Sequence, residues 1–130
     1  MTPELATTPV TRVLVVDDEE GVRNLLQRSL ERAKFDVVGQ ASNGVDGAQL
    51  AGELQPDVVI LDSNMPVMGG EESAGLIRNQ APAAVIVAFS GDLQSCPEWA
   101  DAYLNKGSGG LIESLLLVVG FATLGSKPIL

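Results

Sequence analysis

This chain of 130 residues contains no histidine, and cysteine, tryptophan and tyrosine occur once each. The absence of histidine excludes histidine-dependent catalytic triads and metal sites built on imidazole. The single thiol, Cys96, has no partner for a disulfide within the chain, which favours a reducing compartment such as the cytoplasm. Aromatic residues make up only 4% of the chain, too few to enclose the ring of a flavin, so a flavin carrier is not expected.

Positive charge is also scarce, with 8 lysine and arginine residues against 17 aspartate and glutamate residues and a net charge of −9. Because nucleic-acid phosphates are bound mainly by lysine and arginine, this segment is not expected to bind nucleic acid directly. The apolar run at residues 115–124 is well short of the roughly 20 residues that a membrane-spanning helix needs. The N-terminus lacks the apolar core of a signal peptide. We therefore expect a soluble, acidic, cytoplasmic protein.

What the chain does contain is a series of short apolar runs that alternate with helical patterns. Apolar residues make up 45% of the sequence, enough for one globular domain of this length. Strands are expected at residues 13–17, 36–41, 57–62, 84–89 and 102–105, and helices at about 19–34, 44–54, 71–80 and 109–120. Strict alternation of strand and helix predicts an α/β fold, a doubly wound parallel sheet with helices on both faces. The expected organisation is a flexible N-terminal arm at 1–10, a folded domain at 11–122 and a C-terminal tail at 123–130.

One connection is shorter than the others. Only 11 residues separate Ser90 from Ala102, and they include Gly91 and Pro97. A crossover between parallel strands generally needs at least about 10–12 residues, including its helix. The fourth helix is therefore predicted to be one or two turns around residues 97–100, or to be missing.

The last predicted helix has apolar residues on more than one face. A stripe facing the core is expected at Ile112, Leu115, Leu116 and Val119, and a second set is expected to point elsewhere, at Leu117, Val118 and Phe121. Two interpretations stay open. Either the tail folds back over the second set, or an apolar face from Ser90 to Phe121 serves for homodimer formation or partner docking.

Five polar residues stand where apolar runs end, namely Asp17, Asp18, Asp62, Ser90 and Lys106. Taken alone, each has an ordinary explanation: a helix N-cap for an aspartate, a turn for a serine, solvent for a lysine. The runs ahead of them, however, are typical of buried strands in a parallel sheet. The carboxyl ends of such strands meet at one edge, where open α/β sheets place their sites. We therefore expect the five residues to form a single site.

The residue types suggest the chemistry of that site. Aspartates 17, 18 and 62 would crowd together and repel, so that either one is protonated or a cation neutralises them. Oxygen ligands without sulfur or imidazole point to Mg²⁺ or Mn²⁺. Lys106 adds a fixed positive charge and Ser90 a hydroxyl donor, which together suit phosphoryl transfer. Asp62 is the best candidate for the nucleophile, because an aspartate can form an acyl phosphate.

Four segments carry a family signature: VLVVDDE at 13–19, VILDSNMPVMGG at 59–70, FSG at 89–91 and AYLNKG at 102–107. They resemble the receiver domain of two-component response regulators, of the chemotaxis-regulator type, and the similarity covers about residues 11–120. The resemblance implies a five-stranded parallel sheet of order 2-1-3-4-5 flanked by five helices. It also implies that the domain is a signalling module rather than an enzyme.

The resemblance further implies a role for each residue of the site. Asp62 would accept a phosphoryl group from a sensor histidine kinase or a phosphotransfer protein. Asp18 and Asp62 would bind Mg²⁺ together with the backbone carbonyl of Asn64, and Asp17 would hold a metal-bound water. On activation Ser90 and Lys106 would contact the phosphoryl group, and the aromatic ring of Tyr103 would then turn inward.

The chain also departs from the family pattern. The fourth helix is shortened or missing, Gly107 follows the lysine where proline is common, and Gly69 stands where an acidic residue is frequent. A receiver-like scaffold that no longer uses phosphorylation is therefore the alternative function. A phosphatase of the haloacid dehalogenase type is disfavoured, because Asn64 occupies the position of its second acid.

Overall fold

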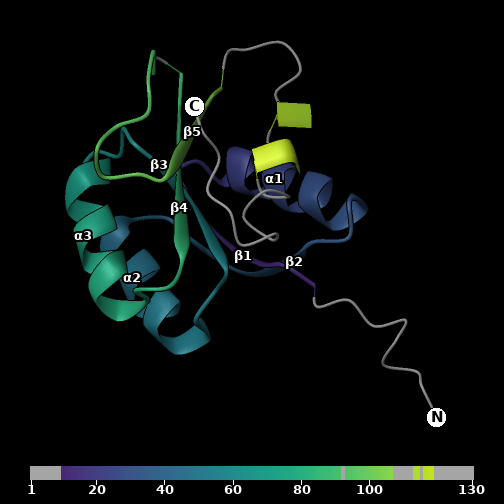
Figure 1. Ribbon diagram of the computed structural model, residues 1–130, viewed down its shortest axis with the longest axis horizontal. Helices are drawn as coiled ribbons and strands as arrows, with labels where there is room; N and C mark the ends of the chain where they lie inside the picture. Colours follow the sequence, from purple (N-terminus) through teal and green to yellow (C-terminus); the bar gives the residue numbers. More distant parts are fainter. Residues whose placement is uncertain (1–9, 92, 107–112, 115, 119–130) are drawn as a thin grey trace.

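The computed structural model describes residues 10–91, 93–106, 113, 114 and 116–118. Its elements are β1 (Arg12–Val16), α1 (Glu20–Arg32), β2 (Asp36–Ala41), α2 (Gly44–Leu54), β3 (Val58–Asp62), α3 (Gly70–Gln80), β4 (Val85–Ser90) and β5 (Ala102–Asn105). Strands and helices alternate from β1 to β4, and β5 then follows β4 with no helix between them in the described residues (Figure 1). Residues 113, 114 and 116–118 are helical.

The strands form one parallel sheet of order β2-β1-β3-β4-β5. This confirms the predicted fold class and strand order, and the predicted bounds of the five strands and of α1, α2 and α3 differ from the observed ones by at most two residues. The agreement has a simple cause. Buried parallel strands are read from short β-branched runs, and the turns between them are marked by glycine, proline and asparagine.

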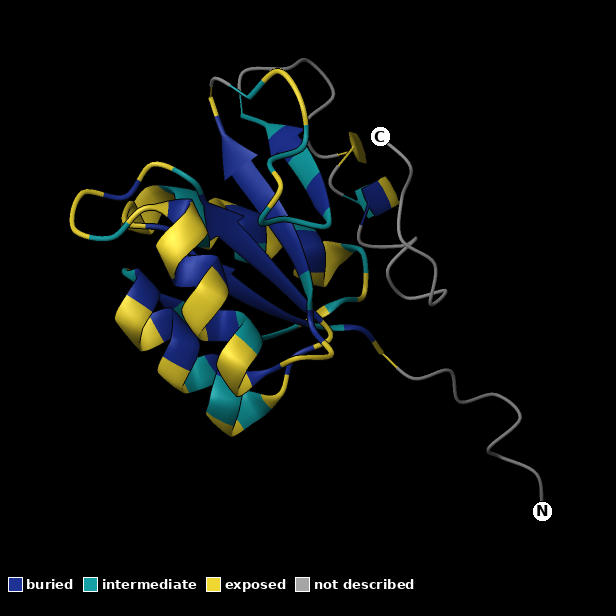
Figure 2. Ribbon diagram, turned by 60° about the vertical axis from the view of Figure 1, so that its left-hand side comes forward, coloured by how far each residue is buried: buried dark blue, intermediate teal, exposed yellow. Residues whose placement is uncertain are grey.

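Side chains alternate between the two faces of the sheet, and the central strands β1, β3 and β4 are almost entirely buried, dark blue in Figure 2. The strand β2 is mostly half-buried, and the outer faces of the helices are yellow. The first core cluster lies on the α1 side and includes Val13, Val15, Ile60, Phe89 and Leu104. The second lies on the α2 and α3 side and includes Leu14, Val16, Leu61, Ile77 and Ile86. The sheet therefore separates two cores.

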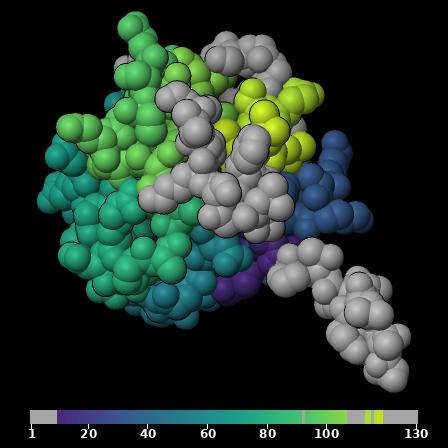
Figure 3. All heavy atoms as spheres, viewed as in Figure 1, coloured from purple at the N-terminus to yellow at the C-terminus, as the bar shows by residue number. Residues whose placement is uncertain are grey.

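The connection between β4 and β5 contains no helix in its described part, residues 91 and 93–101. A single hydrogen-bonded turn is present, in which the N–H of Ala100 donates to the carbonyl of Pro97 at 3.1 Å. This confirms the prediction of a shortened or missing fourth helix. We call residues 93–101 the strap. Its Trp99 and Ala100 pack against the second core cluster, and its green surface adjoins the teal surface of α3 in Figure 3.

The last helix corrects one prediction. Leu117 is exposed, as expected, and Leu116 packs on the first core cluster. Val118 was expected to point away from the core, and this was wrong, because it is buried in the cluster that contains Leu26 and Leu30 of α1. The segment lies beside α1 as well as against the sheet (Figure 1), so its buried arc is wider than one stripe.

Several predictions fall outside the described residues. These are the N-terminal arm except Val10, the tail at 123–130, the Lys106–Gly107 peptide bond, and the positions of Ile112, Leu115, Val119 and Phe121. Within the described part of the chain, no helix is long and apolar enough to cross a bilayer.

Candidate functional site

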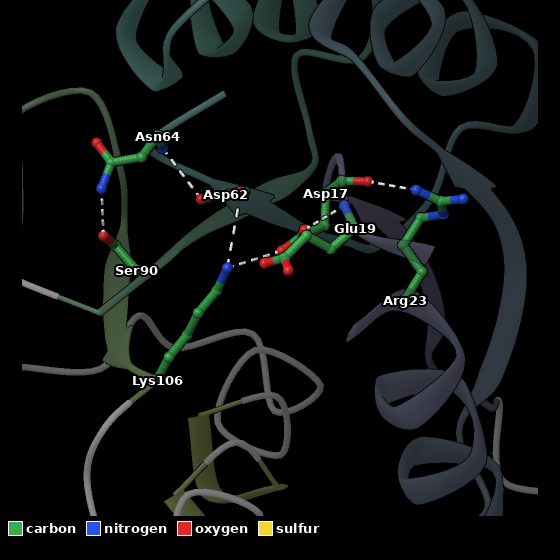
Figure 4. Close-up of polar contacts among 7 residues, drawn as sticks. All are labelled: Asp17, Glu19, Arg23, Asp62, Asn64, Ser90 and Lys106. Atoms are coloured by element: carbon green, nitrogen blue, oxygen red, sulfur yellow. Dashed lines mark hydrogen bonds and ion pairs between the residues drawn. The ribbon is translucent and has the colours of Figure 1, made fainter. Parts of the chain in front are cut away.

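The five polar residues predicted to form a site lie at the carboxyl edge of the sheet. Asp62 and Ser90 are the last residues of β3 and β4. Asp17 and Asp18 follow β1, and Lys106 follows β5. Because β1, β3, β4 and β5 are successive neighbours in the sheet, their ends bring these side chains to one place. Figure 4 shows four of them: Asp17, Asp62, Ser90 and Lys106.

The acidic part of the site is compact. Carboxylate oxygens of Asp17, Asp18 and Asp62 lie within 4.8 Å of one another. Asp17 and Asp62 are buried and Asp18 is exposed. The N–H of Glu19 donates to Asp17 Oδ1 at 2.9 Å, and the N–H of Asn64 donates to Asp62 Oδ1 at 3.0 Å. Carboxylates this close can hold a hard divalent cation, because oxygen ligands are the ones that Mg²⁺ prefers.

The ordinary explanation of Asp17 and Asp18 as N-caps does not hold. The N-cap of α1 is Glu19, and its side chain makes no capping hydrogen bond. Asp17 accepts a hydrogen bond from the N–H of Glu19, which stands one position before the helix, and not from an N–H of the first helical turn. Neither aspartate therefore caps α1, and both belong to the acidic cluster.

Lys106 supplies the positive charge of the site. Its Nζ donates to Asp17 Oδ2 at 3.0 Å, lies 3.6 Å from Asp62 Oδ2, and stands 5.0 Å from the centre of the Phe89 ring. Burial alone would lower the pKa of Lys106. The hydrogen bond to Asp17 and the charges of Asp17 and Asp62 outweigh burial, so the pKa of Lys106 is raised. The ammonium group therefore stays charged beside the carboxylates.

The setting of Asp62 raises the pKa of its carboxylate. Burial raises its pKa from 3.8 to about 6, and the charge of Asp17 adds to the increase. The N–H of Asn64 and the charge of Lys106 act in the opposite direction. A cation held between the carboxylates would offset the cost of ionising Asp62, so the donor set and its electrostatics both suit Mg²⁺.

The side chain of Asn64 joins the site in a way that the sequence did not reveal. Its Nδ2 donates to Ser90 Oγ at 2.8 Å, and Ser90 is buried at the end of β4 (Figure 4). The family resemblance had implied a role only for the backbone carbonyl of Asn64. The direction of a side chain in an irregular loop follows no periodic pattern, so the sequence carried no signal for this contact. Around the next residue, Gly91, the space that a Cβ would occupy is open.

Tyr103 is half-buried on β5, opposite Ala88 of β4 in the register of the sheet. Ser90 follows Ala88 by two positions, so Ser90 and Tyr103 project from the same face of the sheet. This is the face that the strap covers with Trp99 and Ala100. The arrangement places the aromatic ring on the same side as the hydroxyl.

Arg23 of α1 is a further contributor, and the sequence alone did not identify it. Its Nη1 donates to the carbonyl of Asp17 at 2.7 Å, and its Nε donates to Gln40 Oε1 at 3.1 Å. The guanidinium group thus fixes the turn that presents Asp17. The apolar spacing of a helix identifies the residues that face the core and gives no signal for this contact. The contact forms because an arginine side chain is long enough to reach back to the preceding loop.

Comparison with known proteins places the chain in a family. Residues 13–112 match the family described as Response regulator receiver domain. The response regulator GacA of Pseudomonas aeruginosa is 40% identical over 105 residues, which cover 75% of this chain and 49% of GacA. The nitrate/nitrite response regulator protein NarL of Escherichia coli is 39% identical over 101 residues, which cover 77% of this chain and 46% of NarL. The chain spans less than half of the length of these curated relatives.

Solved structures of response regulators have the same fold as this chain. A two-component response regulator of the LuxR family from an Aurantimonas species has a TM-score of 0.83 at 28% identity, over 93% of this chain and 90% of that one. The response regulator domain of Thermotoga maritima CheB has a TM-score of 0.80 at 27% identity, over 92% of this chain and all (100%) of that one. With its sheet order, acidic cluster and family match, this chain belongs to the response regulator receiver domains, which are non-enzymatic signalling modules of two-component systems.

Proposed function

We propose that the domain accepts a phosphoryl group on Asp62 from a sensor histidine kinase or a phosphotransfer protein. The observation that carries this proposal is the setting of the Asp62 carboxylate, which is buried, 3.6 Å from Lys106, and within 4.8 Å of carboxylate oxygens of two other aspartates. Asp62 Oδ would attack the phosphorus of a phosphohistidine. The new O–P bond forms an acyl phosphate as the P–N bond breaks, and the electron pair remains on the imidazole nitrogen of the donor.

The other site residues have separate roles in this proposal. Asp18, Asp62 and the backbone carbonyl of Asn64 would hold Mg²⁺, and Asp17 would hold a metal-bound water. When bound, Mg²⁺ supplies positive charge that offsets the carboxylates and the incoming phosphoryl oxygens. Lys106 adds a second positive charge from the carboxyl end of β5, already directed at Asp17 and Asp62 by its contacts.

We infer that the phosphoryl group switches the face around β5. It adds roughly −1.5 to −2 charge and three strong acceptors at Asp62. Ser90 Oγ would turn to hydrogen-bond one of them, leaving its contact with Asn64, and Tyr103 would move into the space behind it. The register of β4 and β5 supports this coupling, because the serine and the tyrosine share one face of the sheet.

The test is direct phosphorylation. The full chain is incubated with acetyl phosphate and Mg²⁺ and followed by intact mass, with Asp62→Asn as the matched control. We expect the mass of one phosphoryl group on the wild-type chain, lost in base as an acyl phosphate should be, and no gain in the variant. Phosphorylation that persists in Asp62→Asn would show that another residue is the acceptor.

The alternative function is a phosphorylation-independent interaction scaffold. Replacement of the fourth helix by the strap favours it, because part of the surface around β5 is remodelled. This alternative predicts no response to acetyl phosphate or beryllofluoride. It also predicts that wild type and Asp62→Ala bind the same partners.

We further propose that residues 11–122 form the receiver domain and that the face from Ser90 to Phe121 mediates homodimer formation. The exposed side chain of Leu117 supports the second point. Size-exclusion chromatography with light scattering tests it. We expect a larger fraction of dimer after phosphorylation and a smaller fraction in Leu117→Gln; a monomer at high concentration in both states would contradict the proposal.

A further inference from the structure

The strap, which stands in place of the fourth helix, carries one bulky side chain, that of Trp99, and this side chain packs beside α3. A Cβ placed on Gly70, the first residue of α3, would lie 2.6 Å from Cζ2 and 2.7 Å from Cη2 of the indole, and 2.9 Å from Cα of Ser63. Atoms of a real side chain do not approach this closely, so only glycine fits between the ring and the loop backbone. The indole of Trp99 and the backbone of Ser63, the residue after Asp62, therefore both lie close to Gly70.

The backbone of the strap is fixed at both of its ends. Arg78 of α3 donates to the carbonyl of Trp99 at 3.0 Å and pairs with Asp101 at 3.3 Å. Asp101 makes two hydrogen bonds with the backbone of β4, at 2.8 and 2.9 Å. At the other end, Asn105 Nδ2 donates to the carbonyl of Leu93 at 2.8 Å. The indole is thus presented from an anchored segment rather than from a free loop.

On the other side of the contact lies the loop between β3 and α3, residues 63–69. Ser63 bonds through its N–H to the backbone of β4 and through its carbonyl to the first N–H of α3, both at 3.2 Å. The next residue, Asn64, donates its N–H to Asp62. Because Ser63 lies between Asp62 and Asn64 in the chain, a shift of its backbone moves both neighbours.

We propose that Trp99 is a positioning residue for the reaction at Asp62. Its indole packs against Gly70, whose N–H donates to the carbonyl of Ser63 at 3.2 Å, and the loop then presents the N–H and the carbonyl of Asn64 to the acceptor in a fixed place. The strap is thereby coupled to the acceptor through Gly70 and Ser63. This role rests on the proposed phosphorylation of Asp62 and deepens it, because it assigns a task to a segment outside the strand-end cluster.

A role in packing alone makes a different prediction. Trp99 and Leu50 are both half-buried apolar residues that pack against the second core cluster, one from the strap and one from α2. Loss of either side chain should lower the free energy of unfolding. Only a positioning role predicts that loss of Trp99 also slows the reaction at Asp62, so Leu50→Ala is the matched control.

The experiment measures two quantities on the full chain. They are the rate of acyl-phosphate formation from acetyl phosphate, and the dissociation constant for Mg²⁺ alone by calorimetry. We expect Trp99→Ala to slow phosphorylation about tenfold or more, since a displacement on the order of 1 Å is costly in such sites. We expect it also to weaken Mg²⁺ binding, through the carbonyl of Asn64. Leu50→Ala should keep both values within about twofold of wild type, because a distant substitution acts independently.

A second pair of variants decides the question if Trp99→Ala does not fold. Gly70→Ala places a carbon against the ring, and Trp99→Phe removes the Cζ2 and Cη2 edge that this carbon would strike. If the two residues act on the site through one contact, the double variant should react faster than Gly70→Ala alone. Simple addition of the two single effects would count against the contact.

The outcomes separate this inference from the proposed function. If the wild-type chain takes up no phosphoryl group, the proposed function fails and the role of Trp99 fails with it. If the wild type is phosphorylated, but Trp99→Ala and Leu50→Ala change the rate and the Mg²⁺ affinity equally, only the role of Trp99 is overturned. A selective loss in Trp99→Ala, or rescue in the double variant, supports it.

Discussion

The Asp62 carboxylate is ionised at neutral pH at a cost to stability. Its pKa is 3.8 when unperturbed and about 6 in the folded domain, mainly because of burial. Between these values the folded state binds more protons than the unfolded state, so stability falls as pH rises from about 4 to about 6 and stays lower above that range. We therefore expect Asp62→Asn to be more stable than wild type at pH 7.5 without Mg²⁺, by about 1–2 kcal/mol.

Urea unfolding at several pH values checks this prediction. The gain of Asp62→Asn should shrink as the pH is lowered through about 6 and disappear only well below 3.8, where Asp62 is protonated in both the folded and the unfolded state. Added Mg²⁺ should reduce the gain at neutral pH by stabilising the wild type alone. A gain of constant size across this range would mean that it does not arise from ionisation of Asp62.

The contact between Asn64 and Ser90 leads to a second prediction. Its 2.8 Å hydrogen bond holds the hydroxyl at the resting position, and a typical hydrogen bond contributes about 0.5–1.5 kcal/mol net. If Ser90 must leave this position to contact a phosphoryl group, Asn64→Ala should bind beryllofluoride with Mg²⁺ about two- to tenfold more tightly. Ser90→Ala, which lacks the hydroxyl, should bind it more weakly than wild type.

Calorimetric titration of both variants provides the measurement. Asn64→Ala keeps the backbone N–H and carbonyl of residue 64, so its affinity for Mg²⁺ alone should be unchanged. Weaker beryllofluoride binding by Asn64→Ala would show that the carboxamide assists the activated state rather than the resting one.

At the scale of elements, two helical glycines are expected to respond in opposite ways to the same substitution. A Cβ on Gly75, exposed on α3, meets nothing within 4 Å, whereas a Cβ on Gly47 of α2 would lie 2.9 Å from Cγ2 of Val16 on β1. Gly75→Ala should raise the free energy of unfolding by about 0.5–1 kcal/mol, because alanine favours the helix. Gly47→Ala should lower it by about 1–3 kcal/mol through overpacking.

Chemical denaturation of the two variants compares them directly. Helix propensity is the same in both, so the difference between them measures the contact of α2 with β1 alone. Equal gains in stability would mean that the helix moves away from the sheet at little cost.

The strands and the first three helices could be predicted because their signals are local. The central strands β1, β3 and β4 are runs that are apolar almost throughout, and the helices between them carry apolar residues at helical spacing. Even the absence of the fourth helix could be predicted, since the length of the connection between Ser90 and Ala102 limits what fits. The burial of Val118 could not, because it depends on how close α1 lies to the last helix.

The site also has features that the sequence could predict and features that it could not. Strand ends predicted where Asp62 and Lys106 would meet, because the carboxyl ends of parallel strands share one edge. The side-chain bonds of Asn64 and Arg23 and the contact of Trp99 with Gly70 could not be predicted. These contacts depend on loop geometry and on long side chains that reach across elements, and neither leaves a periodic trace in the sequence.

For the whole molecule, the net charge of −9 means that Mg²⁺ can act in two ways: by binding at the acidic cluster, or by screening the acidic surface without a specific site. Mg²⁺ should raise the melting temperature, because a ligand that binds only the folded state stabilises it by mass action. Asp18→Asn should abolish most of this increase, since its carboxylate belongs to the cluster. Asp36→Asn is the control of equal charge, because Asp36 is exposed at the start of β2, away from the cluster.

Thermal unfolding with and without millimolar Mg²⁺ makes the comparison. Asp18 is exposed, so its replacement should leave the metal-free melting temperature close to that of the wild type. The same loss of the Mg²⁺ effect in Asp36→Asn would assign it to non-specific screening of an acidic surface.

The short connection that holds the strap also bears on how the sheet assembles. β4 and β5 are joined by 11 residues, 91–101, whereas β3 and β4 are joined by 22 residues, 63–84. Halving a loop lowers the entropic cost of closing it by about 0.6 kcal/mol. Pairing of β5 with β4 is therefore less costly than pairing of β4 with β3, and pulsed hydrogen exchange should find the amides of β5 protected no later than those of β3. The loss of a helix has brought the far edge of the sheet closer in sequence, and this edge is a place from which folding can begin.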